Sequence, residues 1–273
     1  MTPRPRRIVS LVPSLTELLF ALGAGDAVIG VTRYCTEPAD RVEALTKVGG
    51  TKTPNLRAIL DLAPDLVIMN VEENRREDFE ALQSTGVPLF VSEPKTVADG
   101  IALIARLGAA VGEPERGRTL ADEQAAGVAA VHADVARRAQ PPIRYFCPIW
   151  KKPWMTFNAD TYAHDVLRVA GGENVATDRP QRYPEVGLVA IAARAPEIVL
   201  LPDEPYPFRE RDLPALALLA ETPALAAGRV HLVDGKALAW YGPRIAAGVA
   251  LFAELFAACA IAASSDDGRR SRA

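Results

Sequence analysis

The stretch LAPDLVIMNVEENRRED (residues 62–78) is echoed later in the chain by RAPEIVLLPDEPYPFRERD (194–212). In both, Ala-Pro and an acidic residue precede a short apolar run, and the run ends in a loop that carries a glutamate. Proline ends a helix, and an uninterrupted apolar run of about five residues is typical of a buried parallel strand. The repeat therefore predicts two similar α/β lobes.

Around each copy, strand-like and helix-like segments alternate, as expected of parallel sheets covered by helices on both faces. Residues 114–139 interrupt this alternation and hold no strand pattern. A helix of about 25 residues would be roughly 37 Å long, enough to run along two lobes. We predict an α/β fold of two Rossmann-like lobes with parallel sheets, bridged by one long backbone helix. The alternative is a single doubly wound sheet with one long crossover helix.

The predicted boundaries follow from the same pattern. They are an N-terminal lobe, the bridging helix, a C-terminal lobe and a disordered polar tail, over residues 1–113, 114–139, 140–263 and 264–273.

Composition limits the class of protein. Hydrophobic residues make up 49% of the 273, charged residues 24%, and the formal net charge is −3. Lys and Arg are scattered rather than clustered, so no nucleic-acid partner is expected. No segment reaches the roughly 18 apolar residues that span a bilayer. The N-terminal MTPRPRR leads directly into a strand pattern rather than a signal-peptide core, so the chain as written starts in the cytoplasm.

The sequence does not point to a metal site or to catalysis. Its three histidines fall on separate predicted elements, and its three cysteines are far apart, so neither set is expected to converge. No GxSxG, P-loop or GxGxxG motif is present. We therefore predict no catalytic residue, no metal ligand and no cofactor. The residues in question are His132, His164, His231, Cys35, Cys147 and Cys259.

Five stretches together resemble the helical-backbone (class III) substrate-binding proteins of ABC importers, over about residues 7–258. The cobalamin-binding branch is the most similar and the siderophore-binding branch is next. The stretches are RIVSLVPSLTELLFALGAGDAVIGVTRYCTEP (7–38), VGGTKTPNLRAILDLAPDLVIMNVEENRRED (48–78), GGENV (171–175), AGRVHLVDG (227–235) and WYGPR (240–244).

The resemblance implies a monomer, located in the periplasm or cell envelope, that clasps a corrinoid or another metal chelate between its lobes. Any metal would arrive inside that ligand. It also implies that one glutamate on each lobe docks on arginines of the transmembrane permease subunits. Aligning Pro64 with Pro196 places Glu72 opposite Glu204, and Glu73 remains a competitor. We expect these glutamates to be solvent-exposed.

Wide, flat ligands of that class need aromatic surfaces and a few polar donors. The aromatic candidates lie on predicted loops next to strands or to the last helix: Tyr34, Trp150, Trp154, Trp240 and Tyr241. The alternative is that the tryptophans pack the hinge between the lobes.

The polar candidates are cations and a helix N-terminus. Arg33 and Lys151, with Lys152 beside it, could meet carboxylates or a corrinoid phosphate, although such residues are more often only solvated. Ser14 and Glu17 form an S-x-x-E pattern, so Ser14 is expected to cap a helix whose amides could also donate to a ligand.

One stretch departs from the cobalamin branch, which carries a tryptophan where this chain has Thr51 or Lys52. Because the N-terminus as written shows no signal-peptide pattern, a second function also stays open: a cytoplasmic corrinoid-handling protein, or an enzyme, on the same scaffold.

Overall fold

The repeated Ala-Pro-acid phrase has the same backbone geometry in both places. In the computed structural model, which describes residues 4–270 and the side chains as far as residue 260, Ala63 and Ala195 both have φ of +45°. Each alanine follows a short helix, and each precedes a buried five-residue strand. The two helices are α3 (Leu56–Asp61) and α8 (Leu188–Ala192), and the two strands are β4 (Leu66–Asn70) and β8 (Ile198–Pro202).

The acid of each phrase fastens that strand to its neighbour. The Asp65 carboxylate accepts the backbone N–H of Arg7 at 2.9 Å, and the Asp65 N–H donates to the Arg7 carbonyl at 2.9 Å. Glu197 and Arg144 make the same two bonds, at 3.0 and 2.7 Å. The two copies of the phrase are therefore similar in structure as well as in sequence.

The chain divides into two compact units, each with its own sheet. Unit 1 contains the chain up to Pro94 together with Ala98–Ala125 and Trp240–Ile245, and unit 2 contains Lys95–Val97, Ala126–Ala239 and the chain from Ala246 onward. The long helix α6 (Pro114–Arg138) contributes residues to both units. Two parallel-sheet α/β lobes are thus confirmed.

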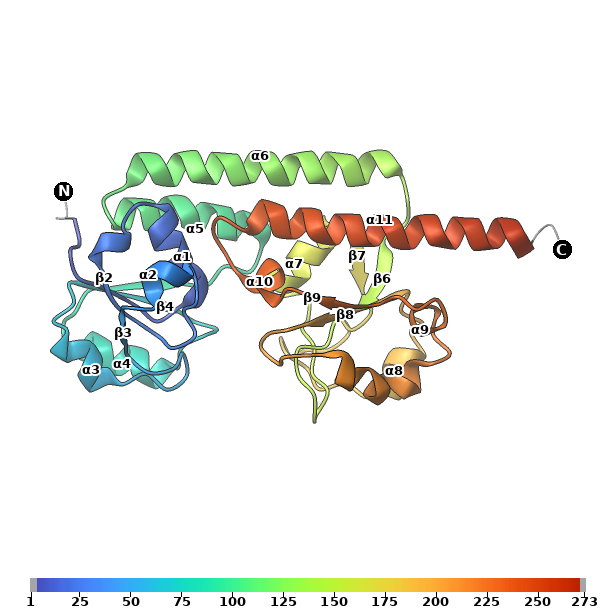
Figure 1. Ribbon diagram of the computed structural model, residues 1–273, viewed down its shortest axis with the longest axis horizontal. Helices are drawn as coiled ribbons and strands as arrows, with labels where there is room; N and C mark the ends of the chain where they lie inside the picture. Colours follow the sequence, from blue (N-terminus) through green and yellow to red (C-terminus); the bar gives the residue numbers. More distant parts are fainter. Residues whose placement is uncertain (1–3, 271–273) are drawn as a thin grey trace. The chain divides into compact units, whose positions relative to one another are not determined.

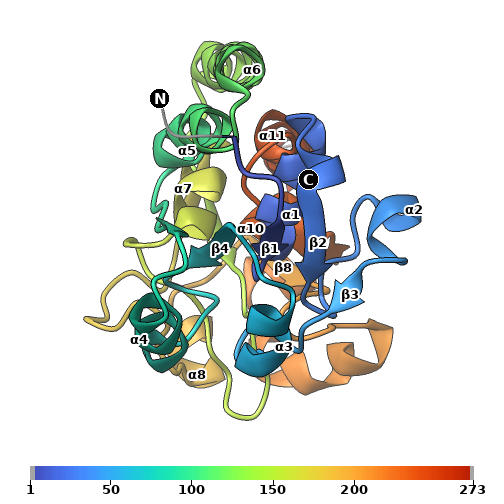
Figure 2. The same cartoon turned by 90° about the vertical axis from the view of Figure 1, so that its left-hand side faces the viewer.

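The sheet of unit 1 is parallel, with strand order β3-β2-β1-β4-β5. Helices α3 and α4 lie on one face, while α1 and α5 lie on the other (Figures 1 and 2). The elements introduced here are β1 (Ile8–Ser10), α1 (Pro13–Ala21), η1 (Gly25–Ala27), β2 (Val28–Val31), α2 (Ala39–Val42), β3 (Thr46–Lys47), α4 (Arg76–Ser84), β5 (Leu89–Ser92) and α5 (Val97–Ala110).

Alternating residues of these strands fill two apolar layers. On the α3 and α4 face, Val9 and Val67 pack with Ile59 and Leu82. Ile8, the residue before Val9 in the strand, is not part of this cluster and is also fully buried. Burial on both sides explains why these strands have apolar residues at successive positions, with a polar residue, Ser10 or Asn70, only at the carboxyl end.

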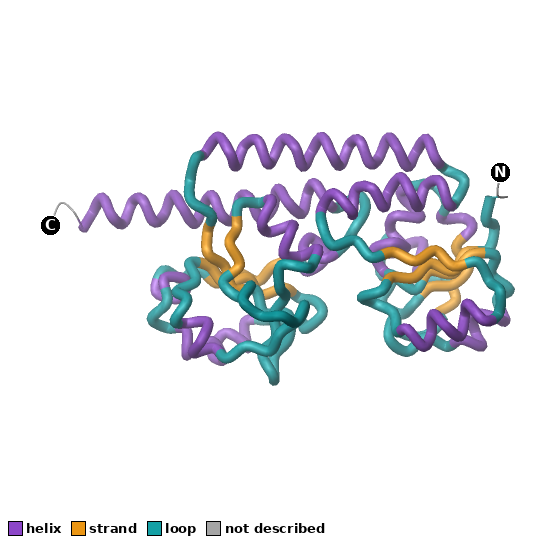
Figure 3. The backbone as a smooth tube through the Cα atoms, turned by 180° about the vertical axis from the view of Figure 1, so that it is seen from behind, coloured by secondary structure: helices purple, strands orange, loops and turns teal. Residues whose placement is uncertain are grey.

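The sheet of unit 2 is parallel, with strand order β7-β6-β8-β9, and its strands are drawn in orange in Figure 3. Helices α8 and α9 cover one face, and α7 covers the other together with part of α11 (Figure 1). The elements introduced here are β6 (Ile143–Phe146), α7 (Tyr162–Val169), β7 (Gly172–Asn174), the 3-10 segment η2 (Glu210–Leu219), α9 (Pro223–Ala226), β9 (Val230–Val233), α10 (Gly235–Ala239) and α11 (Ile245–Arg270).

Each face of this sheet has its own core. Phe146, Val199 and Leu201 pack toward α8, η2 and α9. On the opposite face, the ring of Tyr145 stacks on Phe256 of α11 at 5.9 Å between centroids.

Several details differ from the sequence prediction. Strands β3 and β7 were not expected, because neither contains an apolar run. Helix α11 continues to Arg270, so residues 264–270 of the predicted tail are helical, and 271–273 lie outside the described residues. Within residues 4–270, none of the helices combines the length and apolar character that crossing a bilayer requires.

Glycines let α5 and α6 approach closely within unit 1. A Cβ added to Gly108 would lie 2.7 Å from the Cα of Gly117, which is too short for a carbon–carbon contact. The two helices run side by side in Figures 1 and 3.

We expect Gly108→Ala to lower the free energy of unfolding by about 1–3 kcal/mol, because overpacking must separate the helices. This loss would occur despite the better helix propensity of alanine, worth about 1 kcal/mol. Urea unfolding measures it. The neighbouring Ala109, which is exposed, supplies the control: Ala109→Gly should cost only its helix propensity. Wild-type stability in Gly108→Ala would contradict the close crossing.

Candidate functional site

Both sheets have a topological switch point, where ligands of open α/β sheets bind beside the carboxyl ends of the strands. In unit 1 it lies between β1 and β4, and in unit 2 between β6 and β8. Most of the predicted site residues follow the carboxyl ends of strands β1, β2, β4, β6 and β8.

Four aromatic rings form a continuous row in unit 2, which we call the aromatic row: Trp150, Tyr206, Phe208 and Trp154. Trp150 meets Tyr206 edge-on at 5.7 Å, Tyr206 meets Phe208 at 4.6 Å, and Phe208 stacks on Trp154 at 6.0 Å. Trp150 is 43% exposed and Phe208 is buried, so the row runs from solvent into the core. Such a row offers apolar ring surface to a flat ligand.

A tight hairpin presents the two tryptophans. The N–H of Ile149 donates to the Met155 carbonyl at 2.8 Å, and the N–H of Met155 donates to the Trp150 carbonyl at 3.1 Å. The Val186 N–H donates to the Trp154 carbonyl at 2.9 Å. These main-chain bonds hold the hairpin from both sides.

Lys151 lies between the tryptophans in sequence but is not an open cation. Its ammonium donates to the carboxylate of Asp212 at 2.6 Å, and both side chains are largely buried. This hydrogen bond lowers the pKa of the Asp212 carboxyl. The expectation that Lys151 supplies free positive charge to a ligand is therefore corrected: its charge is neutralised by Asp212.

A hollow of about 580 Å³, open to solvent, adjoins the aromatic row at the buried ring of Phe208. It lies past the carboxyl ends of β8 and β9 and carries charges of both signs. Its lining residues are Asp203, Phe208, Arg209, Glu210, Arg211, Leu232, Val233 and Asp234.

In unit 1, Arg33 and Tyr34 form an exposed pair after β2. The guanidinium lies 5.4 Å from the centroid of the Tyr34 ring, which is 55% exposed. Both side chains pack over Gly50, where a Cβ would lie 3.0 Å from the Arg33 guanidinium and 3.3 Å from the Tyr34 ring. The pair has the exposure expected of ligand-contacting residues.

Ser14 does not cap its helix, contrary to the prediction. Pro13 takes the first helical position, so Val12 becomes the N-cap residue and Ser14 enters the first turn. The Ser14 hydroxyl is buried and has no hydrogen-bond partner among the described residues. Glu17, the expected partner in the capping box, instead makes an ion pair with Arg244 at 2.7 Å.

Trp240 and Tyr241 lie on the expected loop but are buried, with exposed fractions of 6% and 4%. The Arg244 guanidinium lies 5.6 Å from the centroid of the Trp240 ring and is itself held by Glu17. The prediction that these two rings offer an open surface to a ligand is therefore corrected.

The three glutamates are half-buried rather than fully exposed, which corrects the expectation of open carboxylates. After β4, the Asn70 carboxamide oxygen accepts the N–H groups of Glu72 and Glu73 at 2.8 and 3.2 Å, which folds the loop back onto the strand. After β8, Gly235 packs so closely on Glu204 that an added Cβ would lie 2.3 Å from its Cγ.

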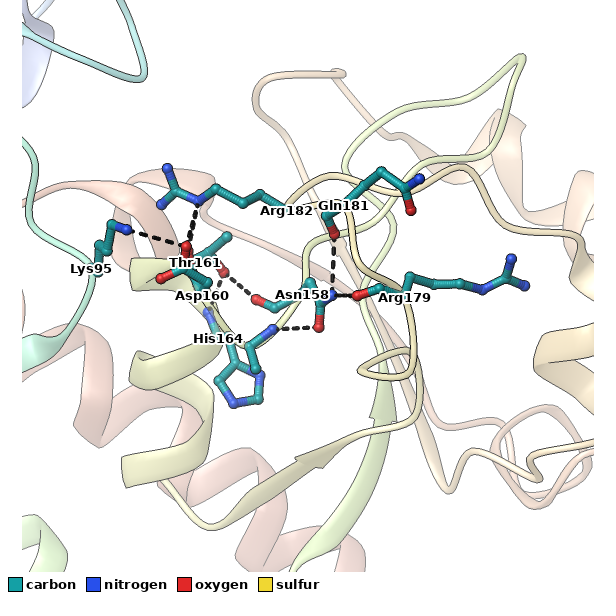
Figure 4. Close-up of polar contacts among 9 residues, drawn as sticks. Lys95, Asn158, Asp160, Thr161, His164, Arg179, Gln181 and Arg182 are labelled. Carbon is teal, nitrogen blue, oxygen red and sulfur yellow. Dashed lines mark hydrogen bonds and ion pairs between the residues drawn. The ribbon is translucent and has the colours of Figure 1, made fainter.

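A second loop of unit 2 is fastened beside the hairpin. The Asn158 amide group donates to the carbonyls of Arg179 and Gln181, and the Asn158 N–H donates to the Arg182 carbonyl at 2.7 Å (Figure 4). The Arg182 Nε–H donates to the Asp160 carbonyl at 2.7 Å. This network holds Tyr183, which is exposed and lies 5.9 Å from the Arg182 guanidinium.

The histidines and cysteines do not assemble a reactive centre in the described part of the chain. There, no group of three or more His, Cys, Asp or Glu side chains could hold a metal ion. Burial lowers the pKa of His164 and His231. Burial also raises the pKa of all three cysteine thiols, so they are protonated near neutral pH.

Sequence reasoning missed Tyr183, Tyr206 and Phe208. The signal for the last two was present in PYPF (205–208), where prolines alternate with aromatic residues directly after the repeated strand. Tyr183 stands alone in a polar stretch, and only the fold brings it beside the hairpin.

Two parallel α/β units with aromatic and charged residues at the carboxyl ends of their strands define a substrate-binding protein. The chain matches the family described as "Periplasmic binding protein" over residues 8–237 and belongs to it. The predicted family and binding function are confirmed.

Among curated relatives, the chain is 30% identical over 196 residues to the "Vitamin B12-binding protein" of Vibrio cholerae, which covers 71% of this chain and 69% of the relative. It is 31% identical over 193 residues to the protein of the same name from Vibrio parahaemolyticus, with the same two coverages.

Two solved structures share the fold. The periplasmic vitamin B12 binding protein BtuF of Vibrio cholerae has a TM-score of 0.83 and 25% identity, over 93% of this chain and 98% of that one. The periplasmic heme-binding protein RhuT from Roseiflexus sp. RS-1 has a TM-score of 0.83 and 28% identity, over 93% and 99%.

We expect Ser14→Ala to leave the free energy of unfolding unchanged or slightly higher, because it removes a buried hydroxyl that has no partner. Asn55 is the matched control, since its side chain accepts the Ala58 N–H at 3.0 Å and caps α3. Asn55→Ala should cost about 1 kcal/mol. Equal losses in urea unfolding of the two variants would contradict the assignment of Val12 as the N-cap.

Proposed function

We propose that this protein captures a corrinoid, or a related metal-containing macrocycle, and delivers it to an ABC importer on the periplasmic side of the membrane. The observation that carries the proposal is the aromatic row of unit 2, which stands at the switch point of its sheet. The relatives named for vitamin B12 and heme support the same class of ligand.

A macrocycle suits these residues physically. Its broad face is largely apolar and stacks on rings such as Trp150 and Tyr206, while its rim carries amides or carboxylates. Within unit 1, the exposed guanidinium of Arg33 beside Tyr34 has the chemistry to bind a carboxylate or a phosphate. The metal belongs to the ligand, and the proposed role requires no chemical step by the protein.

The first test is titration of the purified protein with cyanocobalamin and, separately, with haem, followed by absorbance and calorimetry. For the macrocycle that the wild type binds, Trp150→Ala and Tyr206→Ala should each lower the affinity by about thirtyfold. This is the loss expected when a central aromatic contact worth about 2 kcal/mol is removed. Leu218→Ala, an exposed apolar truncation elsewhere in the same unit, should leave affinity unchanged.

If the protein binds haem but not cyanocobalamin, the proposed ligand class of metal-containing macrocycles stands, but the corrinoid is ruled out as the ligand. Failure to bind either at high micromolar concentration would overturn the proposal. Equal losses in all three variants would indicate a general effect on folding rather than loss of contacts.

We also propose that Glu72 or Glu73 on unit 1, and Glu204 on unit 2, dock on arginines of the permease. All three lie on the loop after the repeated strand; Glu72 and Glu204 are at equivalent positions of the two units, and Glu73 is one residue further along. The half-buried setting supports this role, because a loop held by Asn70 or packed against Gly235 fixes the position of its carboxylate.

The test uses the cognate importer in lipid vesicles and measures ATP hydrolysis stimulated by the loaded protein. Glu204→Lys, and Glu72→Lys or Glu73→Lys, should weaken the interaction at least about tenfold, because repulsion replaces attraction. Glu77→Lys and Glu221→Lys alter exposed glutamates of the same units and serve as controls. Full stimulation by Glu204→Lys would contradict the docking proposal.

A further inference from the structure

We infer that Asp212 is a positioning residue, which holds the aromatic row in its binding arrangement before any ligand arrives. It does not line the row itself. The inference rests on the proposed function for its effect on ligand affinity, whereas its effect on the rings stands on the structure alone.

The Asp212 carboxylate accepts hydrogen bonds from three donors in unit 2. Its Oδ1 accepts the Lys151 ammonium at 2.6 Å and the Tyr206 hydroxyl at 3.3 Å. Its Oδ2 accepts the backbone N–H of Arg209 at 3.0 Å. The carboxylate is only 4% exposed, so these bonds replace its hydration.

These donors come from the two segments that build the row. Lys151 belongs to the hairpin that presents Trp150 and Trp154, whereas Tyr206 and Arg209 belong to the loop that presents Tyr206 and Phe208. Asp212 therefore joins the hairpin to the loop through side chains, and the ring contacts at 5.7 and 6.0 Å lie across the same junction.

The ends of the loop explain why this junction matters. At its start, the Asp203 N–H donates to the Val233 carbonyl at 3.2 Å, and the Asp203 carboxylate accepts the Gly235 N–H at 2.8 Å. At its far end, Asp212 accepts the Arg209 N–H. Tyr206 lies between these two attachments, and its hydroxyl bond to Asp212 sets where its ring stands.

A role in helix capping alone can be distinguished from the positioning role by substitution. Asp212 is also the N3 residue of a capping box at the start of η2, where its side chain accepts the N–H of the N-cap residue Arg209, and an amide can accept that bond as a carboxylate does. Asp212→Asn keeps the size and an acceptor but loses the charge that holds Lys151. The substitution therefore separates capping from positioning.

The experiment uses a Trp240→Phe background, so that fluorescence reports only Trp150 and Trp154. Asp212→Asn should increase quenching of these tryptophans by acrylamide and reduce the near-ultraviolet circular dichroism, with unchanged far-ultraviolet signal. Affinity for the macrocycle should fall about tenfold, since side chains that were already ordered must now be immobilised on binding. Glu221→Gln, an exposed acid just past the other end of η2 and outside the hollow, is the matched control.

Wild-type quenching and affinity in a folded Asp212→Asn protein would overturn the inference. If that variant does not fold, Lys151→Met takes its place, with the exposed neighbour Lys152→Met as control. Increased quenching in Lys151→Met alone supports the role, and equal behaviour of the two lysine variants overturns it. If no macrocycle binds the wild type, the proposed function fails while the quenching result still decides the role of Asp212.

Discussion

The structure depends on one hydrogen-bonded pairing that occurs twice. In each unit the acid after Ala-Pro accepts a strand N–H and returns its own N–H to the same residue, through Asp65 and Arg7 or through Glu197 and Arg144. This pairing sets the register of two central strands, and it therefore decides which residues emerge past their carboxyl ends. The candidate binding residues of both units are positioned by that register.

Much of the fold could be predicted from the sequence, because continuous apolar strands alternate with helices in a recognisable order. The two-residue strand β3 and the polar strand β7 leave no such pattern, since their place in the sheets is decided by neighbouring strands. The start of α1 was misplaced for a local reason. Pro13 already has the backbone angle of a first helical residue, which moves Ser14 out of the capping position.

The candidate site was only partly predictable. Trp150 and Trp154 could be recognised because they lie outside any periodic apolar face. The burial of Trp240 could not, because its surroundings come from distant parts of the chain: Arg244 lies over its ring and is paired with Glu17, 227 residues away. Likewise, the sequence alone predicts that Lys151 is a surface cation, whereas in the fold it forms an ion pair with Asp212.

Tyr206 is flanked in sequence by Pro205 and Pro207. Proline fixes one backbone torsion, so the segment has fewer conformations to lose than an ordinary loop of its length. The backbone around Tyr206 therefore has little conformational entropy left to lose when a ligand binds. For any ligand that stacks on the aromatic row, differences in affinity then reflect the fit of its face to the rings, with little contribution from ordering of the loop.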